Sequence, residues 1–204
     1  MAEIPGTTAP TTPEAVALTN LWIDRLPGSR PVCYTLRGSQ SDRWVRFHSL
    51  PESKRYADGL AEYRELFHRQ TTVLDELLAL TDGEELLVIT SSWSDSEQRI
   101  ERGEEIAAAV PEASPWISVA PHDDNESWSH LFVSRLDRRS PRLIKVLRLV
   151  ADFATGNVLI SDPQLTWLFA PYDGGVDVIA PTPQDRDALR ARHQEWLSKH
   201  PGGY

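Results

Sequence analysis

The stretch WVRFHSLPESKRY, residues 44–56, constrains the fold more than any other part of the chain. Apolar and polar side chains alternate through its first half, which predicts a strand whose residues face opposite sides of a sheet in turn. Val45 and Phe47 then point toward a core. Pro51 has no N–H to donate to a neighbouring strand, so it predicts the end of pairing. A strand, a turn and then a long helix are therefore expected here.

The opposite face of this strand carries Trp44, Arg46 and His48, and Glu52 to Arg55 form a polar turn after it. Two interpretations stay open: a solvated turn before a helix, or a pocket for an anion or carboxylate. Arginine binds carboxylates through two hydrogen bonds, and histidine changes its charge near neutral pH. The pocket would use Arg46, His48, Lys54 and Arg55. Because Arg46 and His48 lie off the core face, we expect replacement of both by alanine to leave the fold intact.

Capping residues and apolar periodicity predict five helices. The longest follows Asp58 as its cap, ends near Gly83, and buries a stripe at helical spacing. That stripe is Leu60, Tyr63, Phe67, Leu74, Leu77 and Leu78. Ser94 to Glu97 has the form of a capping box that opens a further helix. The predicted ranges are 12–26, 59–80, 94–110, 141–153 and 182–199.

Short apolar or alternating runs predict the strands. Residues 31–37 are expected to pair with the Trp44 strand as a hairpin, and residues 86–90 to form a strand buried on both faces, with a serine-rich loop after it. Strands are also expected at 116–120, 128–136, 157–160, 165–169 and 176–179. A tight turn is expected at residues 171–175, because Asp-Gly and Gly-Gly tolerate positive φ.

Together these elements predict one α+β domain over residues 12–204, after a disordered tail at residues 1–11. Its sheet is antiparallel or mixed, ends in a three-stranded meander, and is packed by four to five helices. No apolar run is long enough for a transmembrane helix and no secretory signal is evident. Cys33 is the single cysteine, which favours a reducing, cytoplasmic setting, and its apolar surroundings indicate a buried side chain rather than a nucleophile.

The formal net charge of −9 argues against nucleic-acid binding and is compatible with a basic protein partner. The sequence has no nucleophile elbow, no phosphate loop and no zinc-protease motif, so we name no catalytic residue. We expect no cofactor and no metal, because the acidic loop His122–Glu126 lacks an established ligand spacing. Monomer and homodimer both remain open.

The residues 44–56 and 162–179 resemble a bacterial domain family of unknown function, marked by the motifs WxRFHSLPxSKRY and PYDGGxDVI. The resemblance spans roughly residues 43–200 and implies no established activity. Relatives are expected to carry histidine just before Pro171, where this chain has Ala170. That departure argues against a catalytic histidine at the turn. Small acidic domains of this kind often serve as immunity proteins, which is an analogy only.

Three functional hypotheses follow. The first is a non-catalytic protein-binding domain, for example an immunity or antitoxin-like inhibitor of a basic bacterial toxin domain. The second is a small-molecule-binding protein or enzyme with an Arg/His/Asp pocket, in which His48 pairs with Asp173 or Asp177; the third is a structural or regulatory domain. Candidate ligand or partner residues are Trp44, Arg46, His48, Lys54, Arg55, Tyr172, Asp173 and Asp177. A concave pocket would favour the second hypothesis, and a flat acidic and aromatic surface the first.

Overall fold

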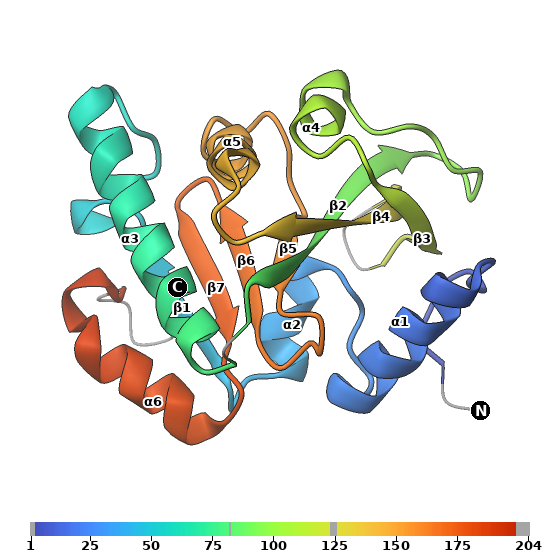
Figure 1. Cartoon of the computed structure of the whole chain (residues 1–204), viewed down its shortest axis with the longest axis horizontal. Helices are drawn as coiled ribbons and strands as arrows, with labels where there is room; N and C mark the ends of the chain where they lie inside the picture. Colours follow the sequence, from blue (N-terminus) through green and yellow to red (C-terminus); the bar gives the residue numbers. More distant parts are fainter. Residues whose placement is uncertain (1–2, 82, 123–125, 199–204) are drawn as a thin grey trace.

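Seven antiparallel strands form one sheet in the order β1-β7-β6-β5-β2-β4-β3 (Figure 1). The computed structural model describes residues 3–81, 83–122 and 126–198. The strands are β1 (Trp44–His48), β2 (Glu85–Ser94), β3 (Ser114–Val119), β4 (Trp128–Asp137), β5 (Leu159–Ser161), β6 (Leu168–Tyr172) and β7 (Gly175–Ile179). The predicted α+β architecture is confirmed, and the sheet is antiparallel rather than mixed.

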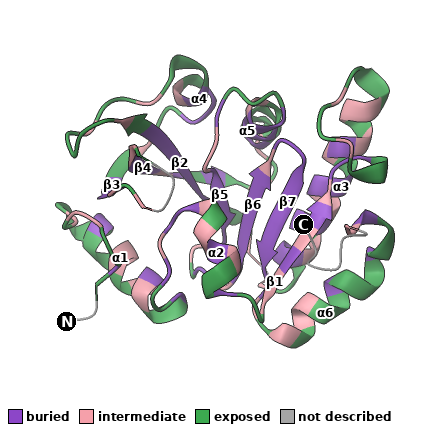
Figure 2. Ribbon diagram, turned by 180° about the vertical axis from the view of Figure 1, so that it is seen from behind, coloured by how far each residue is buried: buried purple, intermediate pink, exposed green. Residues whose placement is uncertain are grey.

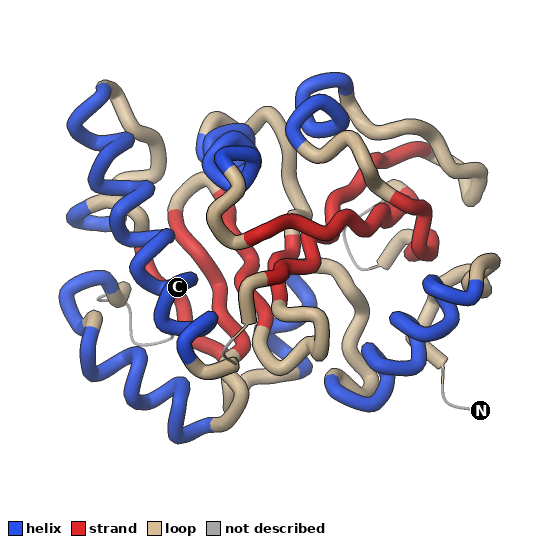
Figure 3. Tube along the Cα trace, in the orientation of Figure 1, coloured by secondary structure: helices blue, strands red, loops and turns tan. Residues whose placement is uncertain are grey.

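Helices cover both faces of the sheet, as the tube in Figure 3 shows. They are α1 (Pro13–Arg25), α2 (Cys33–Ser39), α3 (Leu60–Ala79), α4 (Glu104–Ala109), α5 (Pro141–Ala151) and α6 (Pro183–Arg192). The apolar residues of α3, α4, α5 and α6 pack on one face of the sheet, and those of α1 and α2 on the other. The central strands lie between these two cores and are buried, as Figure 2 shows.

The longest helix, α3, forms where it was expected, but its buried side is different. Its cap is Gly59 rather than Asp58, and Leu60 is 68% exposed. The buried side begins at Leu66 and continues through Val73, with two polar members, Arg69 and Gln70. The stripe predicted from apolar residues alone therefore began at Leu60, more than one helical turn before the buried side begins at Leu66. Tyr63 and Phe67 are half-buried, while Leu74, Leu77 and Leu78 are buried as predicted.

The strand predicted at residues 31–37 is wrong, because Cys33–Ser39 is helix α2. Val32 and Leu36 are both buried at the spacing of one helical turn. The Cys33 N–H at the start of this helix donates to Asn157 Oδ1 at 2.8 Å. A residue far away in the sequence therefore satisfies the helix end, and the predicted hairpin with residues 44–48 does not form. Burial raises the pKa of the Cys33 thiol, with a smaller contribution from Asp177.

The predicted three-stranded meander is confirmed as β5-β6-β7, although its middle strand starts later than expected. Leu165 has a φ of 50°, which is incompatible with a strand residue. The Asp162 carboxylate accepts hydrogen bonds from the Thr166 N–H at 2.7 Å and from the Thr166 hydroxyl at 2.9 Å. This turn delays the strand until Leu168. The turn to β7 lies at Asp173-Gly174, within the predicted range.

The segment after β2 also differs from its prediction. β2 continues to Ser94, so the serine-rich loop predicted at residues 91–95 is mostly strand. The Ser94 hydroxyl donates to the Ser96 carbonyl at 2.9 Å and caps no helix. The helix begins only at Glu104, after Gly103. A local turn that uses the same hydroxyl therefore replaces the predicted capping box.

The N-terminal segment, expected as a disordered tail, lies against the outer edge of β3. Thr7 forms a bridge with Val119, and the Thr8 N–H donates to the Ser118 carbonyl at 2.9 Å. Ile4 is buried in the core of the α1 and α2 side. These residues therefore cover part of an otherwise open sheet edge.

Candidate functional site

Strand pairing brings the two resembling stretches of the sequence together. β1 lies next to β7, with Arg46 opposite Asp177 and His48 opposite Gly175. Arg46 Nε lies 2.6 Å from Asp177 Oδ1, and Arg46 Nη2 lies 2.7 Å from Asp177 Oδ2. This two-point geometry is the strongest form of an arginine–carboxylate pair. Asp177, interpreted from the sequence as a solvated or ligand-binding residue, is buried and paired within the chain.

Two aromatic rings flank the Arg46 guanidinium. Its central carbon lies 4.8 Å from the Tyr172 ring centroid and 5.6 Å from that of Trp44. Burial opposes the charge of Arg46, but hydrogen bonds and charge from Asp177 outweigh burial and raise its pKa. Burial raises the pKa of Tyr172 to about 12, against the opposing effect of Arg46. The sequence candidates Trp44, Arg46, Tyr172 and Asp177 therefore form one cluster.

A second ion pair extends this cluster toward the turn before α3. Arg55 Nε lies 2.7 Å from Asp173 Oδ2, and the Asp173 side chain is only 4% exposed. A hydrogen bond to Asp173 raises the pKa of Tyr56. A Cβ added to Gly174 would lie 3.0 Å from the Tyr172 ring and 3.5 Å from the Arg55 side chain. Arg55, the other arginine of the predicted pocket, therefore also forms an ion pair with a carboxylate of the chain, that of Asp173.

Lys54 does not join the cluster. Its ammonium lies 2.7 Å from Asp58 Oδ2 and 2.6 Å from Glu62 Oε1. Glu62 also accepts the Asp58 N–H at 2.7 Å. These contacts fix the approach to α3, so the structure gives Lys54 a local role at the helix start.

His48 borders a small cavity at the end of β1. The cavity has a volume of about 300 Å³ and is also lined by Leu50, Glu195 and Trp196. His48 Nε2 is buried and has no hydrogen-bond partner among the described residues. Burial lowers the pKa of His48, and the nearby Arg46 and Arg69 lower it further. No hydrogen bond of the described residues joins His48 to Asp173 or Asp177, the two partners predicted for it.

A buried histidine on β4 was missed by the sequence analysis. His130 Nε2 lies 2.8 Å from Ser94 Oγ, and His130 Nδ1 lies 2.8 Å from Ser118 Oγ. Burial lowers the pKa of His130, and Arg99 lowers it further. The alternation of β4 could have predicted that His130 is buried, because His130 shares a sheet face with Phe132, which is buried. Both ring nitrogens are satisfied by hydroxyls, which stabilises a neutral ring.

The segment from Asp95 to Glu112 gathers acidic side chains on the surface. Its exposed carboxylates are Asp95, Glu97, Glu101, Glu104, Glu105 and Glu112, and none forms an ion pair with another described residue. The arginines of the segment turn inward: Arg102 Nη2 donates to the Val110 carbonyl at 2.8 Å, and Arg99 and Arg102 lie over the Phe132 ring. The segment therefore carries six exposed carboxylates against two arginines, of which Arg102 is influenced by the charge of Glu101, and its net charge is negative.

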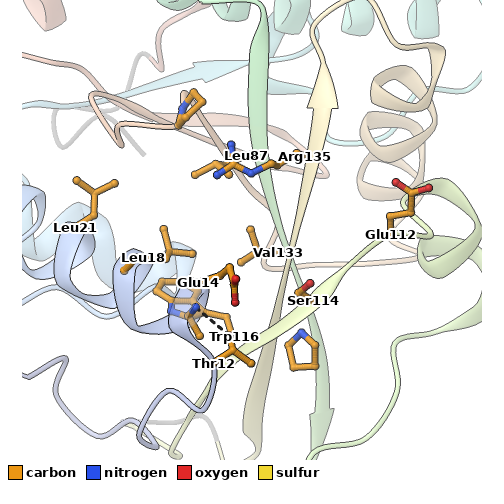
Figure 4. Close-up of a pocket in the computed structure, with 14 residues that line it drawn as sticks. Thr12, Glu14, Leu18, Leu21, Leu87, Glu112, Ser114, Trp116, Val133 and Arg135 are labelled. Atoms are coloured by element: carbon orange, nitrogen blue, oxygen red, sulfur yellow. Dashed lines mark hydrogen bonds between the residues drawn. The ribbon is translucent and has the colours of Figure 1, made fainter.

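An apolar groove lies between α1 and the β2, β4 and β3 strands (Figure 4). Its volume is about 540 Å³. Leu18 and Leu21 approach from α1, and Trp116 and Val133 line it from the sheet. The sequence analysis missed this groove, because it depends on how α1 packs against three strands.

No group of three or more His, Cys, Asp or Glu side chains in the described ranges is arranged to hold a metal ion. Of the acidic loop that was considered for metal binding, residues 123–125 lie outside the described residues. No described helix combines the length and apolar content that a membrane span requires.

Comparison with known proteins supports the resemblance. The sequence model of one family, described as Domain of unknown function (DUF3885), matches residues 32–201. The match includes both resembling stretches, at residues 44–56 and 162–179. No curated protein and no solved structure matches the chain.

Proposed function

The chain belongs to this family of unknown function, and from its surface we propose a non-catalytic protein-binding domain that receives a basic partner. The observation that carries this proposal is the acidic segment Asp95–Glu112, whose six exposed carboxylates outnumber its two arginines and form no ion pair with another described residue. Uncompensated charge on one protein steers an oppositely charged partner and selects against partners of the same sign. The net charge of −9 adds a long-range component of the same sign.

Exposed apolar side chains accompany the charge. Ile100 lies inside the acidic segment and is 46% exposed. Trp93, two residues before the segment, is also exposed, and tryptophan is enriched among residues that dominate binding energy. The Ser92 hydroxyl donates to the Ile100 carbonyl at 2.7 Å, which anchors the loop to β2. An anchored loop loses less conformational freedom on binding than a free one.

The cluster around Arg46 supports a partner-binding rather than an anion-binding function. Arg46 is paired with Asp177 and Arg55 with Asp173. An anionic substrate would have to displace the Asp177 carboxylate from Arg46, or share Arg55 with Asp173. The cluster therefore serves to join β1 to β7. The charged surface that can attract a partner is the acidic segment.

Site-specific photo-crosslinking tests this proposal. A benzophenone amino acid replaces Ile100 in one variant and Leu80 in the control, because both side chains are 46% exposed. Leu80 precedes the start of β2 at Glu85, whereas the Ile100 carbonyl is bound at Ser92, roughly 23 Å further along the strand at 3.3 Å per residue. In cells of the source organism, we expect Ile100 to capture a discrete basic protein that Leu80 does not. Equal capture at the two positions would contradict the proposal.

A charge-reversal variant provides the second readout. Glu104→Lys with Glu105→Lys should abolish capture at Ile100, because it places two cations on the surface that faces a basic partner. Asp187→Lys with Glu195→Lys is the control, since both carboxylates are exposed and lie on or just after α6, at the other end of the molecule from α4 (Figure 1). Loss of capture in the control alone would show that the binding surface lies elsewhere.

A finer form of the proposal is an immunity or antitoxin-like inhibitor that acts in the bacterial cytoplasm on a basic toxin domain. The acidic surface supports it through charge alone. Co-expression of the chain with the captured partner should then restore growth that the partner alone arrests, and the Glu104→Lys, Glu105→Lys variant should not. A captured partner with no effect on growth would contradict the inhibitor hypothesis, and the proposal of a protein-binding domain would stand without it.

The alternative, a small-molecule-binding protein or enzyme, is favoured by one observation: the unpartnered His48 Nε2 beside a cavity of about 300 Å³. A ligand in this cavity would hydrogen-bond to His48. A metabolite screen by thermal shift checks this, with His48→Phe as the variant that fills space and removes the nitrogen. A compound that stabilises the wild type and not the variant would support this alternative.

A further inference from the structure

We propose that the groove between α1 and β3 binds an amphipathic helix whose apolar side is flanked by lysine or arginine. The groove is lined by Leu18 and Leu21 of α1 and by Trp116 and Val133 of the sheet (Figure 4). This inference rests on the proposed function, because it describes how the same basic partner anchors itself.

The floor of the groove is suited to aliphatic side chains. Trp116 is almost completely buried, and its indole N–H donates to Thr19 Oγ1 at 3.0 Å, so its polar atom is already satisfied. Leu18, Leu21 and Val133 are half-buried, which leaves part of each side chain open to the groove. Covering such apolar surface is favourable, because it removes that surface from water. Helices that bind in grooves use apolar anchors one turn apart in this way.

The charges at the rim specify the sign of the occupant. Glu14 on α1 and Glu112 before β3 both line the groove, and Figure 4 places them on opposite sides of it. Both are exposed, and neither forms an ion pair with another described residue. Arg135, the cation of the groove, is held by Glu85. The charges that form no ion pair are therefore negative, Glu14 on the α1 side of the groove and Glu112 on the β3 side. They complement cations on both flanks of an apolar helix.

Glu112 connects the groove to the acidic segment. It is the last carboxylate of Asp95–Glu112 and also a lining residue of the groove. A basic partner that is steered to the acidic segment therefore meets the groove at its edge. Charge supplies the approach, and the groove supplies the buried contact that slows dissociation.

Three fluorescein-labelled peptides provide the probe. The first is a helical peptide of leucine and lysine, with leucine at helical spacing. The second replaces every lysine by glutamine and keeps the leucines, and the third replaces every leucine by serine and keeps the lysines. Fluorescence anisotropy at low salt should rank the leucine–lysine peptide at least tenfold tighter than either of the others. Equal binding by the lysine–serine peptide would overturn the proposal, because charge alone would then explain binding. Equal binding by the leucine–glutamine peptide would also overturn it, because the rim would then have no role.

A space-filling variant locates the binding site. Ala17 is exposed and lines the groove, whereas its neighbour Val16 is exposed and does not. Ala17→Trp should weaken binding of the leucine–lysine peptide at least tenfold, and Val16→Trp should leave it within about twofold. Both positions are at the surface of α1, and equal thermal midpoints would show that both variants are folded. Unchanged binding by Ala17→Trp overturns the proposal.

The carboxylates are tested separately, because Ala17→Trp reports only on the space. Glu14→Gln with Glu112→Gln should weaken the leucine–lysine peptide about threefold to tenfold, the range for two solvent-exposed ion pairs, and should leave the leucine–glutamine peptide unchanged. If Ile100 captures a partner while Ala17→Trp has no effect on peptide binding, the groove inference fails and the proposed function stands. If the peptide result is as expected while Ile100 captures no more than Leu80, the proposed function fails instead.

Discussion

Arg46 and Asp177 lie 131 residues apart in the sequence and directly opposite each other on β1 and β7. Their two hydrogen bonds, at 2.6 and 2.7 Å, join β1, an edge strand of the described sheet, to its neighbour β7. The Arg46 side chain is 21% exposed and that of Asp177 is 10% exposed. The pair is therefore shielded from most solvent, and it changes what substitutions at this position should do.

We expect Arg46→Ala to lower the free energy of unfolding by about 2 to 3 kcal/mol, because it leaves the Asp177 carboxylate buried without its partner. The expectation from sequence that the fold stays intact without Arg46 and His48 remains a prediction, to which the Asp177 pair adds this cost. Urea unfolding of Arg46→Ala, Asp177→Ala and the double variant measures the effect. The double variant should lose at least about 1 kcal/mol less than the sum of the single losses. Additive losses would show that the two side chains do not interact.

Gly175→Ala should separate β1 from β7. A Cβ at Gly175 would lie 2.2 Å from the backbone oxygen of Phe47, which cannot move away without disturbing the strand pair. We expect a loss of at least about 2 kcal/mol in urea unfolding, in the range of overpacked cores. Gly38→Ala is the control, since Gly38 lies in α2 with open space around it and should gain up to about 1 kcal/mol. A stable Gly175→Ala variant would contradict the observed register.

Stability should fall as the pH is lowered from 7 to 5. The pKa values of His130 and His48 are lower in the folded chain than in the unfolded chain, mainly because of burial. Their contribution is therefore complete above the unfolded value of about 6.5 and is lost as pH falls below it, by up to about 1.4 kcal/mol per pH unit for each proton. Urea unfolding at pH 7, 6 and 5 measures this slope. His130→Gln should reduce the slope, and an unchanged slope would assign it to other groups.

Ile4 should contribute to stability although it lies near the chain start. Because Ile4 is buried against the α1 and α2 core, Ile4→Ala should cost about 2 kcal/mol in urea unfolding. The control is Val16→Ala, which truncates an exposed side chain and should change stability by less than about 0.5 kcal/mol. A disordered tail, as expected from the composition of residues 1–11, would give no loss for Ile4→Ala either.

Local chemistry made part of the fold predictable. The Thr12 hydroxyl accepts the Ala15 N–H at 3.1 Å, as a capping threonine before Pro13 predicts, and α1 starts there. The Asp173-Gly174 turn and the alternation of β1 were predictable for the same reason, since each depends on neighbouring residues.

Interactions between distant residues account for the errors. Residues 33–39 become helical with their first N–H bound to Asn157, a partner that no local pattern identifies. The candidate site behaves in the same way. Its residue types were predictable from the sequence, but the register that places Arg46 opposite Asp177 depends on β7. Two residues predicted to bind a ligand therefore bind each other.

The place of β1 in the sheet has a consequence for how the chain acquires its structure. β1 is synthesised well before its neighbour β7, because the paired residues Arg46 and Asp177 lie 131 residues apart in the sequence. Until β7 emerges from the ribosome, Val45 and Phe47 have no strand to pair with, and α3 has no complete sheet on which to pack. These apolar side chains therefore stay without their final contacts while the intervening elements are made. Emergence of β7, rather than of β1 and α3, should be the event that commits this domain to folding.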